Sequence, residues 1–408
     1  MSHKITTKQN LRVCVGIFIL ILLVFSLSNG AFAVSSSTGI IEPLYSDPFL
    51  ADGSFYWKPL VDTKIQYPNV PFFAVVNPDD GPGSTPPTCS YDPNRLGNRT
   101  LDYQNGIDKL TNTGVIVLGY VDTINDTTGI QKSYSQVVHE IDTWVGCYQN
   151  VKGILLDDMQ TWPFTSGNLT YYQNLTNYIH GDKKLTYSFG NPGTTTDQRF
   201  IGTVDAMNIF ENGTLPQDTA LAGINNLHLQ YDKSNFIFVS YDQPILPSAA
   251  WIREASLFVK YMFFTNYSLP NPWNGIPSYL SNETAALNTP SILLAINSVE
   301  QNGTSLFGPV IQIKHSNSLL RMAPTPFNYN TTRLTYEITA DLCYGNWKFD
   351  YWESNHLHKI GNRSSPTIFI LPASQTLTAH YKYVSSCNDV LHKSPHVFNP
   401  NHHRQGKN

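Results

Sequence analysis

The sequence feature that most constrains the fold is a series of eight short apolar runs separated by longer amphipathic or polar stretches. Each run has the length of a β-strand that is buried on both faces, and strands that alternate with helical segments favour a parallel sheet. Eight β–α units within about 245 residues match the size of a (β/α)8 barrel of the TIM type, an α/β fold. The runs span residues 40–45, 71–77, 115–121, 153–157, 185–190, 206–211, 236–241 and 259–265.

The stretches between the runs carry helix signals. Residues 134–144 place apolar side chains at a 3.6-residue period, and Ser133 is the expected N-cap. Residues 248–259 show a similar pattern, with Ser248 as the expected cap. Pro43 lies inside the first run and cannot donate a sheet hydrogen bond. A doubly wound open sheet is the alternative fold, but the sequence has neither a Gly-x-Gly-x-x-Gly nor a phosphate-loop motif for a nucleotide.

In a barrel, the carboxyl ends of the strands meet at one mouth and carry the active site. Carboxylates can act there as acid, nucleophile or base, amides can bind hydroxyl groups, and aromatic rings can stack on sugar faces, so this set favours cleavage of a glycosidic bond. Each amide precedes a proline and could instead build a turn, and each tyrosine could be a core residue. The polar and aromatic residues at the strand ends are Tyr45, Asn77, Tyr120, Asp157, Asp158, Asn191, Glu211 and Tyr241, and Trp162 follows the fourth run.

The two adjacent aspartates differ in their expected orientation. Neighbouring side chains on a strand point to opposite faces, so at most one of Asp157 and Asp158 follows the inward row. The alternative is that Asp157 only ends a strand and Asp158 caps the next helix. In the catalytic interpretation, Phe210 provides an apolar neighbour for Glu211 and favours Glu211 as the proton donor. Asp157 is then the nucleophile or stabiliser, and Asp158 orients substrate or water.

The amino-terminal residues 1–33 have the three-part layout of a secretory signal peptide, with cleavage expected after Ala33. Their apolar segment of about 15 residues is shorter than the roughly 20 that span a bilayer, and an uncleaved anchor that attaches the chain to the cell surface is the alternative. A low content of charged residues, 14%, and abundant sequons suit a secreted glycoprotein. The ten sequons begin at Asn98, Asn125, Asn168, Asn174, Asn212, Asn266, Asn282, Asn302, Asn330 and Asn362.

Cysteine usage also fits an oxidising compartment. Once Cys14 leaves with the signal, an even number of cysteines remains, and their positions suggest the bridges Cys89–Cys147 and Cys343–Cys387. The sequence has no Cys-x-x-Cys and no His/Cys cluster with zinc spacing, so no metal or cofactor is expected. The net charge of −4 gives no basic patch, and a nucleic-acid partner is not expected.

Six motifs in series resemble the spherulin-4 family (spherulation-specific family 4) over roughly residues 38–283. They are Asn77-Pro-Asp-Asp-Gly-Pro-Gly83, Leu118-Gly-Tyr-Val-Asp-Thr123, Gly153-Ile-Leu-Leu-Asp-Asp158, Asn191-Pro-Gly-Thr194, Phe210-Glu211 and the segment from Phe264 to Tyr279. The Pro43-Leu-Tyr45 and Trp57-Lys-Pro-Leu60 segments are also similar to it.

The resemblance implies a (β/α)8 barrel and a glycoside hydrolase that cuts α-1,4-linked galactosamine or N-acetylgalactosamine polymers. It also implies that Asp157 and Glu211 are catalytic acids, because they match the acids of an Asp-Glu pair and of a Phe-Glu motif. Asp158 stands where the family usually has Glu, and its side chain is shorter by about 1.5 Å, one carbon–carbon bond.

After residue 284 the pattern changes to short alternating runs separated by Gly, Asn and Pro, which is typical of a β-sandwich. We therefore expect a barrel over residues 34–284, an accessory β-sandwich over 285–385 and a disordered, histidine-containing tail over 386–408. Trp347 and Trp352 are expected in the sandwich core, although a carbohydrate platform is the alternative. The predicted strands span residues 291–299, 309–313, 334–339, 347–352, 367–371 and 376–381.

The sequence thus predicts a secreted or cell-surface glycoside hydrolase acting on an amino-sugar polysaccharide. One rival is a non-catalytic carbohydrate-binding or matrix protein on a degenerate barrel, which the Asp158 departure favours. A metal-dependent polysaccharide deacetylase would need histidines near the acids, and none lies beside Asp157 or Glu211 in the sequence.

Overall fold

The structure is a computed structural model of the chain. It describes residues 37–83, 89, 99–125, 127–193, 196–216, 227–316, 318–332, 334–355, 366–370 and 373–387. The predicted signal peptide and residues 388–408 of the predicted tail lie outside the described residues. Within these ranges, no helix has the length and apolar character needed to cross a membrane.

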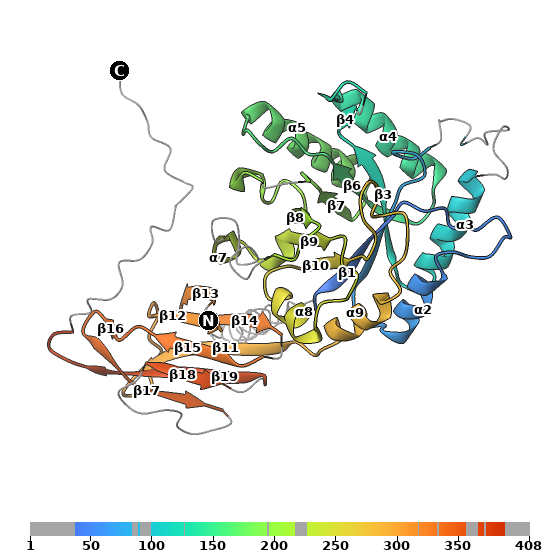
Figure 1. Ribbon diagram of the computed structural model, residues 1–408. Coiled ribbons are helices and arrows are strands. Elements are labelled where there is room, and N and C mark those ends of the chain that lie inside the picture. The colour runs from blue at the N-terminus through green and yellow to red at the C-terminus, as the bar shows by residue number, and fades with distance from the viewer. Residues whose placement is uncertain are drawn as a thin grey trace, which may run out of the picture. The chain divides into compact units, whose positions relative to one another are not determined.

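Eight parallel strands close into the predicted barrel (Figure 1). Around the barrel their order is β1-β10-β9-β8-β7-β6-β3-β2, so each strand pairs with its neighbours in the chain and β10 closes onto β1. The strands are β1 (Gly39–Leu44), β2 (Phe72–Val76), β3 (Ile116–Asp122), β6 (Val151–Asp157), β7 (Tyr187–Gly190), β8 (Ala206–Asn212), β9 (Phe236–Ser240) and β10 (Tyr261–Phe264). The small hairpin of β4 (Ile124–Asn125) and β5 (Ile130–Gln131) lies outside this sheet.

The register of β1 explains how a barrel strand accommodates Pro43. The backbone N–H of Gly39 donates to Lys260 on the β10 side, and that of Ile40 donates to Pro71 on the β2 side. Successive residues alternate sides, so residue 43 faces β10. The ladder between β1 and β10 ends at Ile40, and the hydrogen atom that proline lacks is therefore not needed there.

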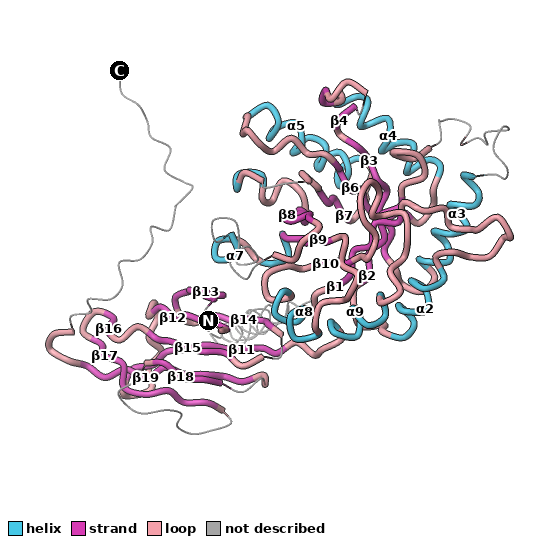
Figure 2. Tube along the Cα trace, viewed as in Figure 1, coloured by secondary structure: helices cyan, strands magenta, loops and turns pink. Residues whose placement is uncertain are grey.

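Helices surround the barrel, as Figure 2 shows in cyan around the magenta strands. The predicted caps are confirmed: Ser133 forms a capping box with Gln136, and the Ser248 side chain accepts from Trp251 N. The helical segments are α2 (Lys58–Gln66), α3 (Arg99–Thr111), α4 (Tyr134–Cys147), α5 (Ser166–Asn177), η1 (Tyr178–Asp182), η2 (Gln198–Phe200), α7 (Leu227–Gln230), η4 (Lys233–Asn235), α8 (Ala249–Ala255) and α9 (Leu280–Leu287).

Aromatic side chains fill the amino-terminal end of the barrel interior. The ring of Phe73 lies 4.7 Å from that of Tyr261 and 5.1 Å from that of Phe189, measured between centroids. The ring of Tyr187 belongs to the same aromatic cluster, with its centroid 5.0 Å from that of Phe73. Such a packed interior leaves the carboxyl ends of the strands as the place for a binding site.

Two carboxyl groups are buried on the outer side of β1. Glu42 points away from the barrel axis, and Glu283 is in α9, which packs on β1. Both residues are 0% exposed, and neither oxygen of Glu42 has a hydrogen-bond partner among the described residues. Burial raises the pKa of Glu42 and of Glu283 well above 4.5, and for Glu283 the charge of Glu42 adds to the effect.

Stability is expected to fall as the pH rises above about 4.5, because the folded chain keeps protons on these two groups that the unfolded chain has released. The contribution of the two protonated carboxyl groups to stability is fully present below their pKa in the unfolded chain. It is lost as the pH rises toward their raised pKa in the folded chain. A Glu283→Gln variant should gain roughly 1–3 kcal/mol over wild type near neutral pH, since one buried ionisation is removed. Thermal unfolding from pH 4 to pH 8 measures this, and an unchanged pH slope would contradict it.

The second half of the chain forms two sheets, of order β14-β11-β19-β17-β16 and β13-β12-β15-β18. The sequence pattern missed β13, β14 and β16, and the last has only two residues. Trp352 is 0% exposed and donates to Pro366 O, so its core position is confirmed. The strands are β11 (Ile292–Glu300), β12 (Val310–His315), β13 (Ser318–Pro324), β14 (Phe327–Thr331), β15 (Tyr336–Ala340), β16 (Cys343–Tyr344), β17 (Trp347–Ser354), β18 (Thr367–Ile370) and β19 (Gln375–Tyr383).

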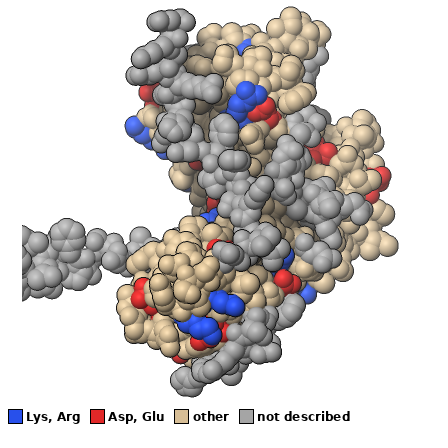
Figure 3. Space-filling model, turned by 90° about the vertical axis from the view of Figure 1, so that its left-hand side faces the viewer, with Lys and Arg blue, Asp and Glu red and all other residues tan. Residues whose placement is uncertain are grey.

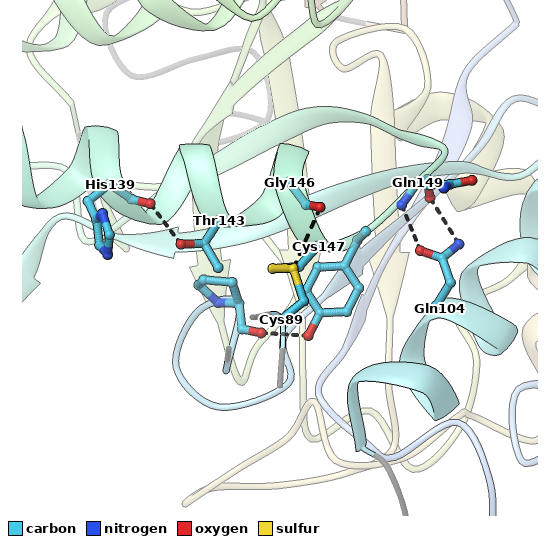
Figure 4. The surroundings of a disulfide bond; sticks show 9 residues. Cys89, Gln104, His139, Thr143, Gly146, Cys147 and Gln149 are labelled. Carbon is cyan, nitrogen blue, oxygen red and sulfur yellow. Dashed lines mark hydrogen bonds between the residues drawn. A yellow bond between two sulfur atoms is a disulfide. The ribbon is translucent and has the colours of Figure 1, made fainter. Parts of the chain in front are cut away.

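Both predicted disulfides are present, Cys89–Cys147 and Cys343–Cys387. The first joins the segment after β2 to the last residue of α4, as Figure 4 shows. Beside it, Gln104 of α3 exchanges hydrogen bonds with the Gln149 backbone, at 2.6 and 3.3 Å. The disulfide therefore links the segment after β2 to the end of α4. At this point α3 is already joined by hydrogen bonds to the turn between α4 and β6.

Charged side chains are sparse on the described surface. On the face shown in Figure 3, the described acidic and basic residues form small groups among uncharged residues, which are drawn in tan. This surface agrees with a chain in which 14% of the residues are charged.

Candidate active site

A pocket opens at the carboxyl ends of the barrel strands. Aliphatic side chains of the strands form part of its wall, and most of its polar and aromatic groups come from residues at or beyond the strand ends, whereas Asn208 lies within β8. Of the predicted site residues, Tyr45, Asp157, Asn191 and Glu211 line it. The full lining is Ile41, Pro43, Tyr45, Val75, Leu155, Asp157, Asn191, Asn208, Glu211, Ile237, Val239 and Trp273.

The end of β6 separates the two aspartates. Leu155 and Asp157 belong to the inward row, so Asp157 faces the pocket. Asp158 adopts a left-handed backbone with φ of 51° and an exposed side chain, and it does not line the pocket. It does not cap the next helix either, because the N-cap of α5 is Thr165. One aspartate is therefore inward and the other turns away, as the alternation predicted.

Hydrogen bonds fix the turn that carries Asp157. The Thr123 hydroxyl donates to the carbonyl oxygens of Asp157 at 2.8 Å and of Asp158 at 3.1 Å. Met159 N donates to Asn191 O, and Asn191 N donates to Leu156 O. These bonds join the exit of β6 to the exits of β3 and β7, so the backbone under the carboxylate is held from both sides.

Glu211 is held by two amides. Its Oε2 accepts from Asn191 Nδ2 at 2.8 Å and from Asn208 Nδ2 at 3.1 Å, and Asn208 Nδ2 also reaches Asn191 Oδ1 at 3.0 Å. Strict alternation would put residues 208 and 211 of β8 on opposite faces. The pairing of β8 with β9 shifts between Asn208 and Phe210, and this β-bulge brings both side chains into the pocket.

The two asparagines predicted to bind substrate differ in position. Asn191 holds Glu211 through its amide and also accepts from Gly193 N, so it both builds a turn and contacts a site residue. Asn77 is 8% exposed, accepts from Gly81 N at 2.9 Å and does not line the pocket. The observed contact of Asn77 is the one expected for a turn residue.

Of the four predicted aromatic residues, Tyr45 lines the pocket, whereas Tyr120 and Tyr241 contact residues that line it. The ring of Tyr45 contacts that of Tyr120 at 5.3 Å, and Tyr120 lies behind it with 8% exposure. Tyr241 packs at 6.0 Å against Trp273, which lines the pocket from the loop after β10. Trp162 is 70% exposed and does not line the pocket.

The pocket makes the carboxyl groups harder to ionise. Burial, followed by the charges of Glu211 and Asp158, raises the pKa of Asp157 to about 7, against the opposing effect of a hydrogen bond from Tyr120. Burial also raises the pKa of Glu211, which the amide of Asn191 partly offsets. Two carboxyls that interact so strongly titrate as a pair, and the pair still holds protons near neutral pH.

Two of the polar and aromatic lining residues, Asn208 and Trp273, were not among the predicted site residues. Asn208 was missed because a β-bulge cannot be read from the spacing of apolar residues. Trp273 belongs to the long segment after the eighth run, and no periodicity indicates where such a loop folds. Within the described ranges, no three His, Cys, Asp or Glu residues are placed to hold a metal ion.

Comparisons with known proteins add a family and a fold. The family model described as Spherulation-specific family 4 matches residues 39–287. Spherulin-4 of Physarum polycephalum is 32% identical over 143 residues, which are 35% of this chain and 37% of that protein, so the match spans little more than a third of the relative's length.

Two solved structures align with this chain as follows. Sph3 of Aspergillus clavatus in complex with GalNAc aligns with a TM-score of 0.50 and 24% identity, covering 62% of this chain and 99% of that chain. The glycoside hydrolase domain of PgaB (BpsB) from Bordetella bronchiseptica aligns with a TM-score of 0.38 and 10% identity, covering 61% of this chain and 98% of that chain.

Proposed function

This chain belongs to spherulation-specific family 4, and we propose on that basis that it is a glycoside hydrolase acting on an amino-sugar polysaccharide. The observation that carries the proposal is the joint placement of Asp157 and Glu211 in one pocket with the aromatic residues Tyr45 and Trp273. Glycosidases divide catalysis between two such carboxylates. That a protein with a similar fold was solved with GalNAc agrees with an amino-sugar ligand.

Glu211 suits the role of proton donor. Its Oε2 already accepts two N–H groups, so a proton bound to Glu211 sits on Oε1. The two asparagines thereby orient the acid, and burial raises its pKa, which favours the protonated form that a proton donor needs. This proton would pass to the glycosidic oxygen as the bond to the leaving sugar breaks.

Asp157 suits the role of nucleophile or base. Tyr120 donates to its carboxylate, while its buried Oδ1 has no hydrogen-bond partner among the described residues. When the proton resides on Glu211, the charge that raises the pKa of Asp157 is removed, and Asp157 ionises more readily. The ionised carboxylate of Asp157, a residue that lines the pocket, is then available to attack the sugar or to activate water.

The proposal includes export of the enzyme. Disulfides form in oxidising compartments, and the two bridges suit a secreted or cell-surface chain. Such a location would place the enzyme where extracellular polysaccharides are met.

The test is to incubate the full chain with α-1,4-linked galactosamine and N-acetylgalactosamine polymers and with chitin, and to measure new reducing ends. We expect new ends from the galactosamine-type polymers and few from chitin. Binding of these polymers without any new reducing ends would instead support the rival function, a non-catalytic carbohydrate-binding protein.

A further inference from the structure

Three aromatic residues form a row across one end of the five-stranded sheet in the second half of the chain. Tyr344 of β16 pairs with Trp347 of β17, and Trp347 pairs with Tyr383 of β19. Residues that lie opposite one another on adjacent strands share one face of the sheet and have Cβ atoms about 5 Å apart. The row therefore extends over about 10 Å, the span of three strands. We call Tyr344, Trp347 and Tyr383 the aromatic row.

The aromatic row continues the inner face of this sheet beyond the core. Phe349 and Tyr381 are the next residues on the same face of β17 and β19, and they are only 3% and 0% exposed. Their rings are in contact, with 5.9 Å between centroids. Tyr383, two residues further along β19, is 62% exposed, and Tyr344 is 38% exposed. The inner face thus ends in rings that the rest of the fold leaves open.

Contacts hold the rings in place. The rings of Trp347 and Tyr383 lie 5.7 Å apart between centroids, with an interplanar angle of 80°. Tyr344 lies against the backbone of Gly308, where a Cβ would collide with the tyrosine hydroxyl and where a φ of 112° also favours glycine. The disulfide Cys343–Cys387 joins the residue before Tyr344 to the segment after β19. A preorganised row loses little conformational entropy when a ligand binds.

The row is too small for a protein partner. With about 200 Å² for each fully exposed aromatic side chain, the three residues expose roughly 250 Å². Phe307, the residue before Gly308, is 66% exposed and raises the total to roughly 400 Å². A stable interface between two proteins takes about 800 Å² from each partner. A narrow ligand fits this area better than a second copy of the chain does.

The chemistry of the row suits sugar rings. Each of its side chains combines an apolar ring face with a polar group at the edge, a phenol hydroxyl in two cases and an indole N–H in the third. A pyranose likewise presents C–H groups on its faces and hydroxyl groups around its rim. Sugar faces can therefore pack on the rings while rim hydroxyls bond to the polar edges. None of the three side chains carries a charge, so the row does not select an ionic ligand.

We infer that the aromatic row is a polysaccharide-binding site, which takes consecutive sugar rings of a chain lying across β16, β17 and β19. No member of the row lines the pocket of the barrel, so the site is additional to the candidate active site. Binding at the row requires no cleavage, and the inference therefore goes beyond the proposed function. A polymer held by one part of the chain is met by the other part at a raised effective concentration.

The test is binding of the full-length chain to insoluble polysaccharide, measured as depletion of protein from solution. The probes are an α-1,4-linked N-acetylgalactosamine polymer and chitin, and every chain carries Glu211→Gln so that the polymer stays intact. We expect Tyr344→Ala combined with Tyr383→Ala to raise the Kd for at least one probe about tenfold, because each aromatic contact contributes about two- to tenfold. Binding to neither probe, or an unchanged Kd, would overturn the inference.

Tyr351→Ala is the matched control. Tyr351 also belongs to β17, but it pairs with His380 and stacks on its ring at 4.2 Å between centroids. His380 is next to the inward Tyr381, so this pair lies on the opposite face of the sheet. The control should change the Kd by less than about twofold, as expected outside the contact. An equal loss in the control would contradict the assignment, and so would a wild-type dimer that the row variant dissociates.

Kinetics separate the row from the candidate active site. With Glu211 restored, the row variant should keep kcat/KM on a short soluble oligosaccharide of the same sugar and lose about two- to tenfold in rate on dilute insoluble polymer. Equal losses on both substrates would contradict a separate site. Absence of cleavage by the wild-type chain would overturn the proposed function alone, because the comparison of Kd values still decides whether the row binds polysaccharide.

Discussion

Replacing Glu211 by glutamine is expected to reduce cleavage of a natural amino-sugar polymer by about 10²–10⁴-fold, the usual contribution of a general acid. Glutamine keeps the shape and an acceptor oxygen for the amides of Asn191 and Asn208, but it has no proton to give to the leaving sugar. A synthetic glycoside whose leaving group needs no proton should therefore be cleaved within about tenfold of the wild-type rate. The measurement is the initial rate of wild type and of Glu211→Gln on the polymer and on the synthetic glycoside.

The partner variant, Asp157→Asn, should lose both activities by about 10³-fold or more, because no leaving group replaces the attacking or water-activating carboxylate. Asp242→Asn is the control: Asp242 follows β9 but does not line the pocket, and its φ of 54° suits asparagine. An active Glu211→Gln on the polymer would contradict the proposal. If instead Asp157→Asn were the variant that kept activity on the synthetic glycoside, the roles of the two acids would be exchanged.

The barrel could be predicted because its signal is repeated eight times. Each strand is a short apolar run, and an error at one run, such as the doubt raised by Pro43, does not change the count. The structure shows that residue 43 faces the side of β1 where the ladder to β10 has already ended. Register of this kind depends on neighbours far away in the chain, so it could not be read from the sequence.

The position of the candidate acids was also predictable, because a barrel gathers the carboxyl ends of its strands. The hydrogen-bonded surroundings of the acids could not be predicted in this way. A β-bulge brings Asn208 into the pocket, and Trp273 lines the pocket from the loop after β10. Trp162, chosen for its closeness in sequence to Asp157, is exposed, since closeness along a loop does not fix the direction of a side chain.

The sandwich was harder to predict than the barrel. Its long strands alternate apolar and polar residues, as in β19, whereas β14 carries two asparagines and β16 has only two residues. Short edge strands of this kind depend on pairing rather than on their own composition. The predicted boundary after residue 284 falls within α9.

Removing the Cys89–Cys147 bridge with a double serine variant is expected to destabilise the chain by about 4 kcal/mol, because it frees a segment of 58 residues in the unfolded state. Removing Cys343–Cys387, with a separation of 44, should cost nearly the same, about 4 kcal/mol. Thermal or denaturant unfolding under oxidising conditions measures both.

The two bridges should differ in their effect on catalysis. Cys89 follows the turn that contains Asn77 and Gly81, and Tyr148, the residue after Cys147, donates to Pro82 O at 2.6 Å. Loss of that bridge should loosen the turn after β2 that contains Asn77 and Gly81, at the carboxyl ends of the strands, and lower kcat/KM by about tenfold, as misplacement of site residues does. Cys343 and Cys387 lie at β16 and after β19, and no residue of either strand lines the pocket, so their loss should leave kcat/KM of the folded fraction unchanged. Equal kinetic losses in the two variants would show that the Cys89–Cys147 bridge stabilises the fold without organising the active site.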